Sequence, residues 1–520
     1  MQDSQTGPQL IARTIGVGEP AAAWGKVIDQ STCIGCHACT TACKSENDVP
    51  LSVNRTFVKS VDVGIYPEAR RSFQVTRCNQ CTDAPCVAAC PTSAMFTRPD
   101  GIVDFDKSAC IGCKACMAAC PYDAIFINPE DHSAEKCNFC AHRLDMGLEP
   151  ACVVVCPTQS IMVGDLNDPD SRVAQYVNRE PVTVRRPEKN TKPKLYYKDA
   201  TEFTLDPLAA GRPPGDTFAW TEQPRGRHVV SGPTTPQNSS AAAVISYDVA
   251  HRAPWDWRVS LYTWTKGIAS GAYLVPLLLL MTGWLDASDG LWVWSAPVVA
   301  ATFLAITAGL LVWDLDHPAR FFYILTRPQW RSWLVRGGVI LAGFAAALGV
   351  HLLGSLFGVA GLRTAAAVVG LPLSVLAAVY TAYLFAQAKA RDLWQNPLLP
   401  PHLAVQAALS GAAAMLLIAT WSSDADVVTA LGWVLGGASL LHLLFVLGEV
   451  TLPHVTGHAR QAGHEMVAGR YGRFFWAGVV LVAVGLLAPW LGAWVALPAL
   501  AGLALHEHAY VQAGQSVPLA

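Results

Sequence analysis

Sixteen cysteines are the residues of this 520-residue sequence best suited to chemistry, and all lie between Cys33 and Cys156. They form four groups of four. Two groups have the spacing C-x2-C-x2-C-x3-C, one has C-x2-C-x4-C-x3-C, and the last has C-x2-C-x11-C-x3-C. In chain order the groups are Cys33, Cys36, Cys39 and Cys43; Cys78, Cys81, Cys86 and Cys90; Cys110, Cys113, Cys116 and Cys120; and Cys137, Cys140, Cys152 and Cys156.

This spacing predicts iron–sulfur ligation. Disulfides suit exported proteins, and the first residues lack the basic and apolar regions of a secretory signal and a twin-arginine pair. Structural zinc favours separated C-x2-C pairs. In a C-x2-C-x2-C-x3-C run, three thiolates ligate one [4Fe–4S] cluster and the fourth ligates a neighbouring cluster. We therefore expect Cys120 to serve a different cluster from Cys110, Cys113 and Cys116.

Residues 26–165 resemble a known family. The stretches CIGCHACTTACKSENDVP, RCNQCTDAPCVAACP, GIVDFDKSACIGCKACMAACPYDAI and KCNFCAHR are similar to four-cluster electron-transfer subunits of molybdopterin oxidoreductases, such as dimethyl-sulfoxide, polysulfide and nitrate reductases and formate dehydrogenases. The resemblance implies two ferredoxin-like halves, with short strands such as GIVDF and AIFINP beside the cluster loops. Because Cys113 is intact, it also implies four [4Fe–4S] clusters. The implied ligand sets are Cys33, Cys36, Cys39 and Cys156; Cys137, Cys140, Cys152 and Cys43; Cys78, Cys81, Cys86 and Cys120; and Cys110, Cys113, Cys116 and Cys90.

Composition divides the rest of the sequence. Residues 1–25 form an N-terminal extension, and residues 166–254 are rich in proline, charge and small polar side chains. This second segment is either a solvated tether or an extended arm that wraps a partner, anchored by Tyr196, Tyr197 and Trp220. The net charge of −2 predicts no binding of nucleic acid.

Residues 255–520 contain apolar runs long enough to span a membrane. We expect eight transmembrane helices, and hence an α+β double ferredoxin-like domain followed by an all-α eight-helix bundle. The expected spans are about 260–285, 293–314, 333–357, 364–388, 402–422, 427–448, 471–489 and 491–510.

Loop charge predicts the orientation of these helices. With eight spans, nine basic residues fall on the side of the cluster domain and only Arg363 on the other. The positive-inside rule then places the cluster domain in the cytoplasm, at the inner membrane of the cell. The nine residues are Arg320, Arg327, Arg331, Arg336, Lys389, Arg391, Arg460, Arg470 and Arg473.

Ionisable and hydrogen-bonding side chains near the cluster side of the membrane suggest a quinone site. Our candidates are Lys266, Asp314, His317 and Tyr383. Lys266 shares a helix face with Tyr262, and Tyr383 shares one with Tyr380 and Gln387. The alternative is structural, with Lys266 reaching toward the interface and the Asp314 to Arg320 loop only fixing helix ends.

Four further residues, His351, His442, Glu449 and Glu507, could form a proton route through the bundle. Haem is the competing use of membrane histidines, but the sequence shows no clear facing pair of histidines at corresponding depth. We therefore expect no haem.

The stretches WDWRVSLYTWTKGIASGAYL, WDLDHPARFFYILTRPQWRSW and YVQAGQSVPLA resemble the NrfD-like membrane anchors of polysulfide reductases. This resemblance implies an eight-helix, haem-free anchor that binds menaquinone or ubiquinone. Together the two resemblances imply a fusion that passes electrons between quinone and a separate molybdopterin subunit carrying molybdenum or tungsten. A proton-translocating redox module and a scaffold held together by its clusters are the alternatives.

Overall fold

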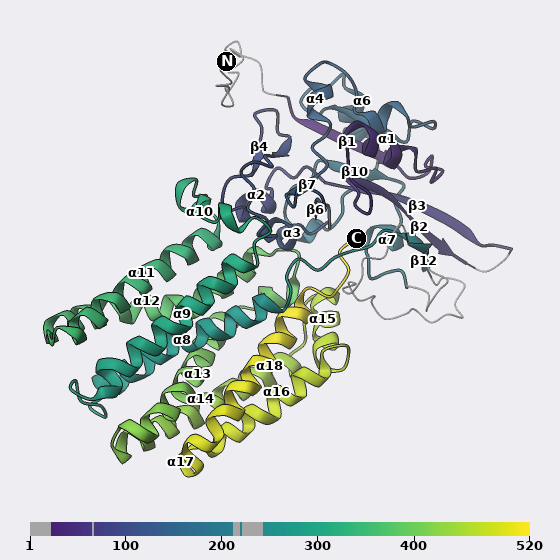
Figure 1. Cartoon of the computed structure of the whole chain (residues 1–520). Coiled ribbons are helices and arrows are strands. Elements are labelled where there is room, and N and C mark those ends of the chain that lie inside the picture. The colour runs from purple at the N-terminus through teal and green to yellow at the C-terminus, as the bar shows by residue number, and fades with distance from the viewer. Residues whose placement is uncertain (1–21, 65–66, 212–218, 221–242) are drawn as a thin grey trace, which may run out of the picture.

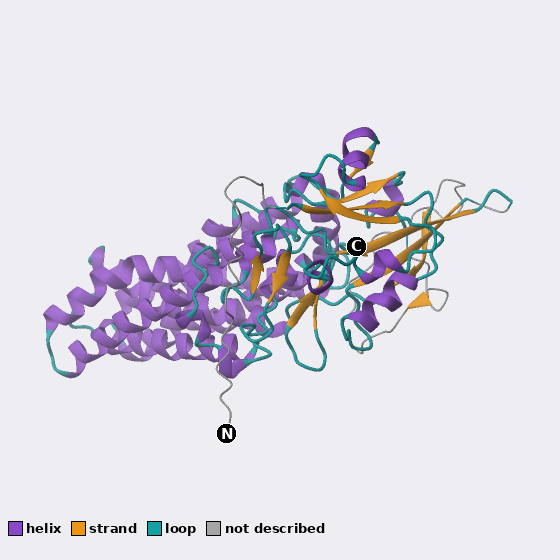
Figure 2. Ribbon diagram, turned by 90° about the horizontal axis from the view of Figure 1, so that it is seen from above, coloured by secondary structure: helices purple, strands orange, loops and turns teal. Residues whose placement is uncertain are grey.

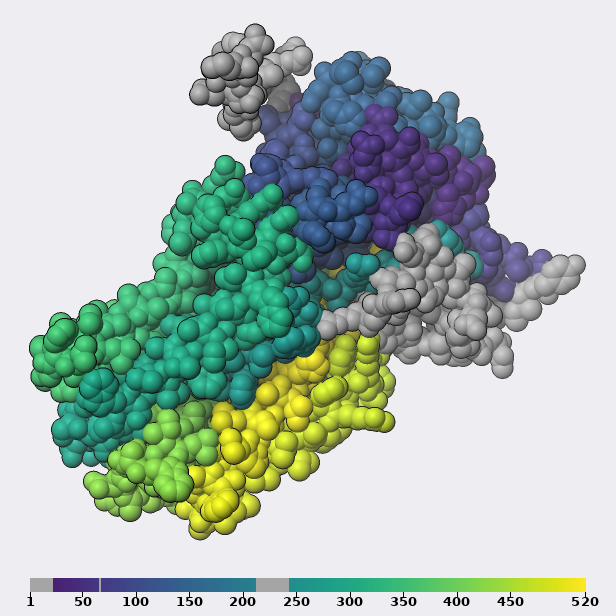
Figure 3. Space-filling view, in the orientation of Figure 1, coloured from purple at the N-terminus to yellow at the C-terminus, as the bar shows by residue number. Residues whose placement is uncertain are grey.

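The computed structural model describes residues 22–64, 67–211, 219–220 and 243–520. They form a cluster domain (residues 22–254) and a membrane domain (residues 255–520), and the cluster domain covers one end of the long helical bundle (Figure 1). The space-filling view shows the two in direct contact (Figure 3). Most of the predicted extension, up to residue 21, lies outside the described residues.

The cluster domain contains two four-stranded sheets. The first has the order β8-β1-β10-β9, with β1 antiparallel to β8 and parallel to β10. The second has the order β11-β12-β2-β3 and includes the long hairpin β2–β3. The strands are β1 (Trp24–Asp29), β2 (Thr56–Val63), β3 (Arg70–Arg77), β8 (Ile161–Asp165), β9 (Val182–Thr183), β10 (Leu195–Lys198), β11 (Ala219–Trp220) and β12 (Ala243–Asp248).

Two small hairpins and several short helices hold the cysteine loops. The hairpins are β4 (Met95–Thr97) with β5 (Val103–Phe105), and β6 (Ile125–Ile127) with β7 (Ala134–Lys136). The strands expected in GIVDF and AIFINP are thus confirmed as β5 and β6. The helices are α1 (Ala38–Glu46), α2 (Pro85–Ala89), α3 (Ala115–Ala119), α4 (Ala141–Leu144), α5 (Ala151–Val154), α6 (Arg172–Arg179) and α7 (Glu202–Leu205).

The described residues between 166 and 211 pack on the cluster domain rather than forming a free tether. Tyr196 and Tyr197 belong to β10, and the buried Tyr197 hydroxyl donates to the Val75 carbonyl at 3.0 Å. Trp220 lies in β11, whose backbone pairs with β12. Most of the remaining segment, residues 212–218 and 221–242, lies outside the described residues.

Long apolar helices form the membrane domain (Figures 1 and 2). Asp256 caps the first of them, since its side chain accepts from the Arg258 amide at 2.8 Å. The helices are α8 (Trp257–Met281), α9 (Ala296–Trp313, preceded by the turn η3, Leu291–Ser295), α10 (Tyr323–Thr326), α11 (Trp333–Leu356), α12 (Ala360–Gln387), α13 (Leu399–Ser422), α14 (Ala425–Thr451), α15 (Gly457–Val467), α16 (Gly472–Val484), α17 (Ala488–Leu491) and α18 (Ala496–Gly514).

Seven segments of the described residues are long and apolar enough to cross a membrane. The predicted count of eight is therefore not confirmed, because residues 472–514 qualify as one segment rather than two. Within that segment the backbone turns back at the short helix α17. Gly478 of α16 lies against Gly502 and His506 of α18, whereas Gly485 lies against Ala499, so α16 and α18 run antiparallel.

Close helix packing defines the bundle core. A Cβ atom on Gly271 of α8 would overlap the Ala407 carbonyl oxygen of α13, and one on Gly411 of α13 would overlap the Gly271 backbone. Only glycine permits this approach of two helix backbones. The contact holds α8 and α13 together along the centre of the bundle.

Residues 515–520 connect the two domains. They leave α18 and run into the cluster domain, where Ala520 packs with Phe57 and Val249. The buried Arg391 guanidinium donates to the carbonyl oxygens of Gln515 and Val517, both at 3.0 Å. This tail therefore fastens the cluster domain to the end of the bundle.

Candidate functional site

The cysteine loops repeat one backbone shape. In both C-x2-C-x2-C-x3-C groups, the glycine before the second cysteine (Gly35, Gly112) has φ near +70°, and the residue after that cysteine (His37, Lys114) has φ near +60°. These left-handed residues curl the loop before α1 and α3 begin. A Cβ on Gly112 would lie 2.6 Å from the Asp316 Cβ of the membrane domain. The third cysteine group therefore packs directly on the membrane domain.

The last cysteine of a group lies near thiols of another group. Burial, together with Cys137, Cys152 and Cys140, raises the pKa of Cys43 to about 12. In the other groups, too, the last cysteine interacts with thiols of a different group. Electrostatic interactions join Cys33 to Cys156; Cys120 to Cys78, Cys81 and Cys86; and Cys90 to Cys110, Cys113 and Cys116.

The residues around the third group fit an iron–sulfur cluster. Cys90, Cys110, Cys113 and Cys116 line one cavity of about 20 Å³. Backbone amides point at the sulfur atoms: Gly112 and Ala134 donate to Cys110 Sγ at 3.4 Å, and Met95 donates to Cys90 Sγ at 3.4 Å. Such donors stabilise the negative charge of cluster thiolates. All sixteen cysteines are free of disulfides.

A buried cation supports another group. Burial alone would raise the pKa of the Cys152 thiol, but Arg77 and Lys26 lower it to about 7. The Arg77 Nη1 atom lies 2.9 Å from Cys152 Sγ. A thiolate, rather than a thiol, binds iron, so this guanidinium favours the form of Cys152 that a cluster needs.

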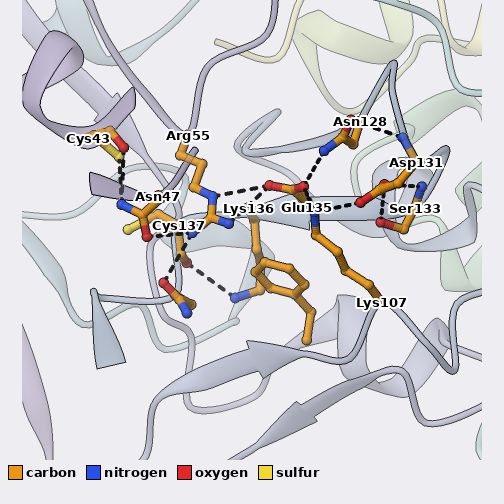
Figure 4. A network of polar contacts seen from close by, with 12 residues as sticks. Cys43, Asn47, Arg55, Lys107, Asn128, Asp131, Ser133, Glu135, Lys136 and Cys137 are labelled. Carbon is orange, nitrogen blue, oxygen red and sulfur yellow. Dashed lines mark hydrogen bonds and ion pairs between the residues drawn. The ribbon is translucent and has the colours of Figure 1, made fainter. Parts of the chain in front are cut away.

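A polar network ties the first group to the fourth (Figure 4). Arg55 donates to Glu135 Oε2 at 3.0 Å and to Asn47 Oδ1 at 2.8 Å. Asn47 in turn donates to the Cys43 carbonyl at 3.1 Å. Since Glu135 lies two residues before Cys137, this buried ion pair fixes the two cysteine groups relative to each other.

The third group adjoins a large apolar cavity in the membrane domain. This cavity, about 540 Å³, lies between α8, α9, α11 and α12, and Cys113 forms part of its wall. Its polar lining comes from Tyr262, Asp314 and Tyr380, together with Trp255, whose Nε1 donates to the Cys113 carbonyl at 3.1 Å. Most of the remaining lining is aliphatic. This arrangement suits an apolar ligand with a polar head directed at the cluster domain.

The structure separates the four residues predicted for a quinone site. Asp314 lines the cavity. Lys266 is buried behind it and donates to the Ala378 carbonyl and Thr381 hydroxyl, both at 2.8 Å. His317 lies in the loop of residues 314–322, which we call the docking loop, and its backbone amide donates to the Ile111 carbonyl at 3.2 Å. Tyr383 stacks on Trp333 and lines a different cavity of about 460 Å³.

Asp314 has the environment of a proton acceptor. Burial raises the pKa of this carboxyl to about 6, although Lys114 and Arg258 oppose the increase. Its backbone carbonyl accepts from Lys114 Nζ at 2.8 Å. Asp314 therefore links the third cysteine group to the cavity, and its charge changes near neutral pH.

The predicted proton-route residues do not form one continuous group. His351 of α11 contacts Tyr273 and Trp292, whereas Glu507 of α18 accepts from Thr263 of α8. The sequence indicated Tyr262 and Tyr380 only as neighbours of other candidates, and it did not single out His402 and His506. Helical spacing could place these four residues on helix faces, but only the packing of the helices shows which faces point into the bundle.

Fold and site together define the class: an iron–sulfur electron-transfer protein with a multi-pass membrane domain. Residues 25–91 and 70–166 each match a model described as a 4Fe-4S dicluster domain. Residues 247–506 match the model of polysulphide reductase, NrfD, and the protein belongs to this family. The predicted fusion of an iron–sulfur subunit with an NrfD-like anchor is confirmed.

Curated relatives match the N-terminal part. The sequence is 42% identical over 179 residues to one of the polysulfide reductase subunits of Wolinella succinogenes, covering 34% of this protein and 94% of the relative. It is 40% identical over 199 residues to one of the tetrathionate reductase subunits of Salmonella typhimurium, covering 37% and 78%. Protein NrfC of Escherichia coli is 41% identical over 196 residues, covering 37% and 87%.

Proposed function

We propose that this protein passes electrons between membrane quinol and a separate molybdopterin subunit, containing molybdenum or tungsten, through four [4Fe–4S] clusters. The relatives include one subunit of a tetrathionate reductase and one of a polysulfide reductase, which supports an equivalent role beside a catalytic partner. The exchanged thiol neighbours described above support the four ligand sets expected from the cysteine spacing. Each cluster would supply a one-electron site when bound.

One observation carries the quinone proposal: Cys113 lines the same cavity as Tyr262, Asp314 and Tyr380. The cavity is apolar enough for the tail of its substrate, menaquinone or ubiquinone, and ends in hydroxyl and carboxyl groups that fit the two ring oxygens. Because Cys113 is part of the cavity wall, a bound ring would lie next to the electron acceptor or donor.

The cavity residues would handle the protons. Oxidation of a quinol releases two electrons and two protons. In this proposal the Asp314 carboxylate accepts one proton and solvent water on the side of the cluster domain takes the other, while the Tyr262 and Tyr380 hydroxyls orient the ring by hydrogen bonds. Lys266 holds α12 against α8 through its bonds to Ala378 and Thr381 and positions Tyr380, whose ring centre lies 5.0 Å from Lys266 Nζ.

The test follows reduction of the iron–sulfur chromophore by added quinol, in the intact protein in detergent. Asp314→Asn and Tyr380→Phe should slow reduction about tenfold to a hundredfold without changing iron content. Tyr383→Phe, in the separate cavity, is the matched control and distinguishes this site from the one that includes Tyr383. Equal rates in wild type, Asp314→Asn and Tyr380→Phe would exclude the cavity.

We further infer eight crossings, with the cluster domain in the cytoplasm. Residues at both ends of the membrane domain meet the cluster domain: Trp255, just before α8, bonds to Cys113, and Ala520, after α18, packs with Phe57. An even number of crossings is needed for this, which supports counting α16 and α18 separately. The excess of basic residues in loops on that side supports the orientation. We place the domain division near residue 254, and residues 26–165 as the cluster-binding part.

A second candidate function is proton translocation coupled to the same redox reaction. Buried polar residues adjoin one another in the interior: Lys266 interacts with Glu507, which accepts from Thr263. Measuring the pH inside sealed vesicles during quinol turnover separates the candidates. Vectorial proton movement beyond that released by quinol would favour this second function. We keep the prediction that no haem is bound, because His402 Nε2 lies only 2.9 Å from His442 Nδ1 and leaves no room for a macrocycle between them.

A further inference from the structure

Three histidines from three helices meet inside the membrane domain. His402 of α13, His442 of α14 and His506 of α18 each place a ring nitrogen within 4.8 Å of the others. All three are buried, with exposed fractions of 5%, 0% and 1%. We propose that they form a transition-metal site, selective for zinc or copper, separate from the cysteine groups.

The first argument is the balance of hydrogen bonds. A neutral imidazole offers one donor and one acceptor nitrogen. Within the cluster, His402 Nε2 and His442 Nδ1 pair at 2.9 Å. In contrast, His442 Nε2 and His506 Nδ1 have no hydrogen-bond partner among the described residues. Buried nitrogens without partners are costly, and coordination of a cation by their lone pairs would remove that cost.

The second argument is ring geometry. With a metal–nitrogen distance of about 2.1 Å, an imidazole centre lies about 3.2 Å from the metal, so two such centres at a tetrahedral angle are about 5 Å apart. The observed separations are 4.9 Å for His402–His442, 4.7 Å for His442–His506 and 5.7 Å for His402–His506. The backbone therefore already holds the three rings at about the separations that a three-histidine site requires.

The third argument is the space and charge beside the rings. A cavity of about 20 Å³ is lined by His402, His506, Gln406 and Glu507. It can hold one water molecule or a fourth ligand. Glu507 adds a carboxyl group to this lining, and a carboxylate beside the rings would offset part of the charge of a cation in an apolar bundle. Imidazole nitrogens favour zinc and copper over calcium and magnesium, which prefer oxygen.

The sequence offers a matched control in His351. It is equally buried, at 0% exposure, and lies in the same bundle, but its ring bonds to the Tyr273 hydroxyl at 3.1 Å and lies outside the three-histidine group. Burial of a membrane histidine alone therefore predicts equal effects at His351 and His442. A metal site predicts an effect at His442 only.

The experiment uses the full-length protein with its iron–sulfur clusters, purified without a polyhistidine tag. After exposure to Zn²⁺ or Cu⁺ and removal of free metal, elemental analysis should give about one zinc or copper per molecule in wild type and in His351→Gln. His442→Gln and His506→Gln should retain at least about tenfold less, with unchanged iron. The Zn²⁺ and Cu⁺ arms show which of the two metals the site takes.

X-ray absorption at the zinc or copper edge gives a second readout on wild type alone, independent of whether the variants fold. It should show nitrogen ligands at about 2.0–2.1 Å with the outer-shell pattern of imidazole. Metal content at background in wild type, equal content in His442→Gln, or oxygen or sulfur ligation at the absorption edge would each overturn the proposal. None of these measurements involves quinol, so they are independent of the proposed electron transfer.

Discussion

His251 should stabilise the contact between the cysteine loops and the segment that enters the membrane, and the size of this stabilisation should depend on pH. Its ring is buried between two carboxylates: Nδ1 bonds to Asp123, three residues after Cys120, and Nε2 lies 3.0 Å from Asp248 at the end of β12. Arg391 also interacts with Asp123. Burial alone would lower the pKa of His251, but Asp248 and Asp123 raise it from 6.5 to about 9.

The size and sign of the effect follow from this pKa. A folded-state pKa above the unfolded value stabilises the protonated, folded form. The stabilisation is complete below pH 6.5, declines above it and is lost as the pH passes 9. The difference between 6.5 and about 9 corresponds to about 3 kcal/mol. With a urea dependence of about 1–3 kcal/mol per M, this predicts a shift of about 1–3 M in the unfolding midpoint.

The assay is urea unfolding of the cluster-loaded protein in detergent, followed by iron–sulfur absorbance between about pH 6 and 9.5. Wild type should lose about 1–3 M more in its midpoint over this range than His251→Gln does. At about pH 6 the variant should already be less stable, since it removes the protonated imidazole that pairs with Asp123 and Asp248. His464→Gln, at an exposed histidine of α15, is the control. The same pH dependence in wild type and His251→Gln would refute the reasoning.

Three further predictions concern packing, protons and the tail. Gly271→Val should destabilise the bundle by about 1–3 kcal/mol, seen as a lower thermal midpoint, because its side chain meets a backbone carbonyl of α13. Gly309→Val should change little, because the new Cβ meets no described atom within 4 Å apart from the neighbouring backbone of its own helix. The rate of quinol oxidation should rise as the pH increases through about 6, where the Asp314 carboxyl loses its proton, and Asp314→Asn should remove that rise; an unchanged pH profile would contradict the role. Deleting residues 515–520 removes carbonyl acceptors of Arg391 and should make the cluster domain more sensitive to protease, and unchanged cleavage would show that the tail does not fasten it.

The local parts of the fold were predictable because their signals are local. Cysteine spacing identified the cluster loops, and apolar length identified the membrane helices. The parallel pairing of β1 with β10 was not predictable, since it joins Lys26–Asp29 to Leu195–Lys198, which lie inside the proline-rich segment of residues 166–254. Composition alone made that segment resemble a linker, whereas the buried Tyr197 shows that it completes a sheet.

The quinone candidates show that helical periodicity alone does not determine which side chain of a helix faces a cavity. Residues three positions apart on a helix differ by about 60° around its axis, so Tyr380 and Tyr383 share a broad face only. In the structure, Tyr380 points into the cavity, while Tyr383 stacks on Trp333 and is 40% exposed. Which tyrosine faces inward depends on how α12 is rotated against α8 and α11. That rotation is set by contacts such as Gly337 against the Tyr380 ring.

The two C-x2-C-x2-C-x3-C loops show how one local shape serves two purposes. Gly35 and Gly112 have the same backbone conformation, but a Cβ on Gly35 would meet Phe73 of its own domain, whereas one on Gly112 would meet Asp316 of the membrane domain. The bare glycine backbone lets the third loop lie flat on the docking loop, where the His317 amide donates to Ile111 and Arg320 donates to the Cys110 carbonyl. Folding of this cysteine loop and docking of the two domains therefore depend on the same contacts. A change that loosens the loop should increase the separation between Cys113 and the cavity. The rate of electron transfer should therefore depend on the order of this loop as well as on the residues that react with the quinone.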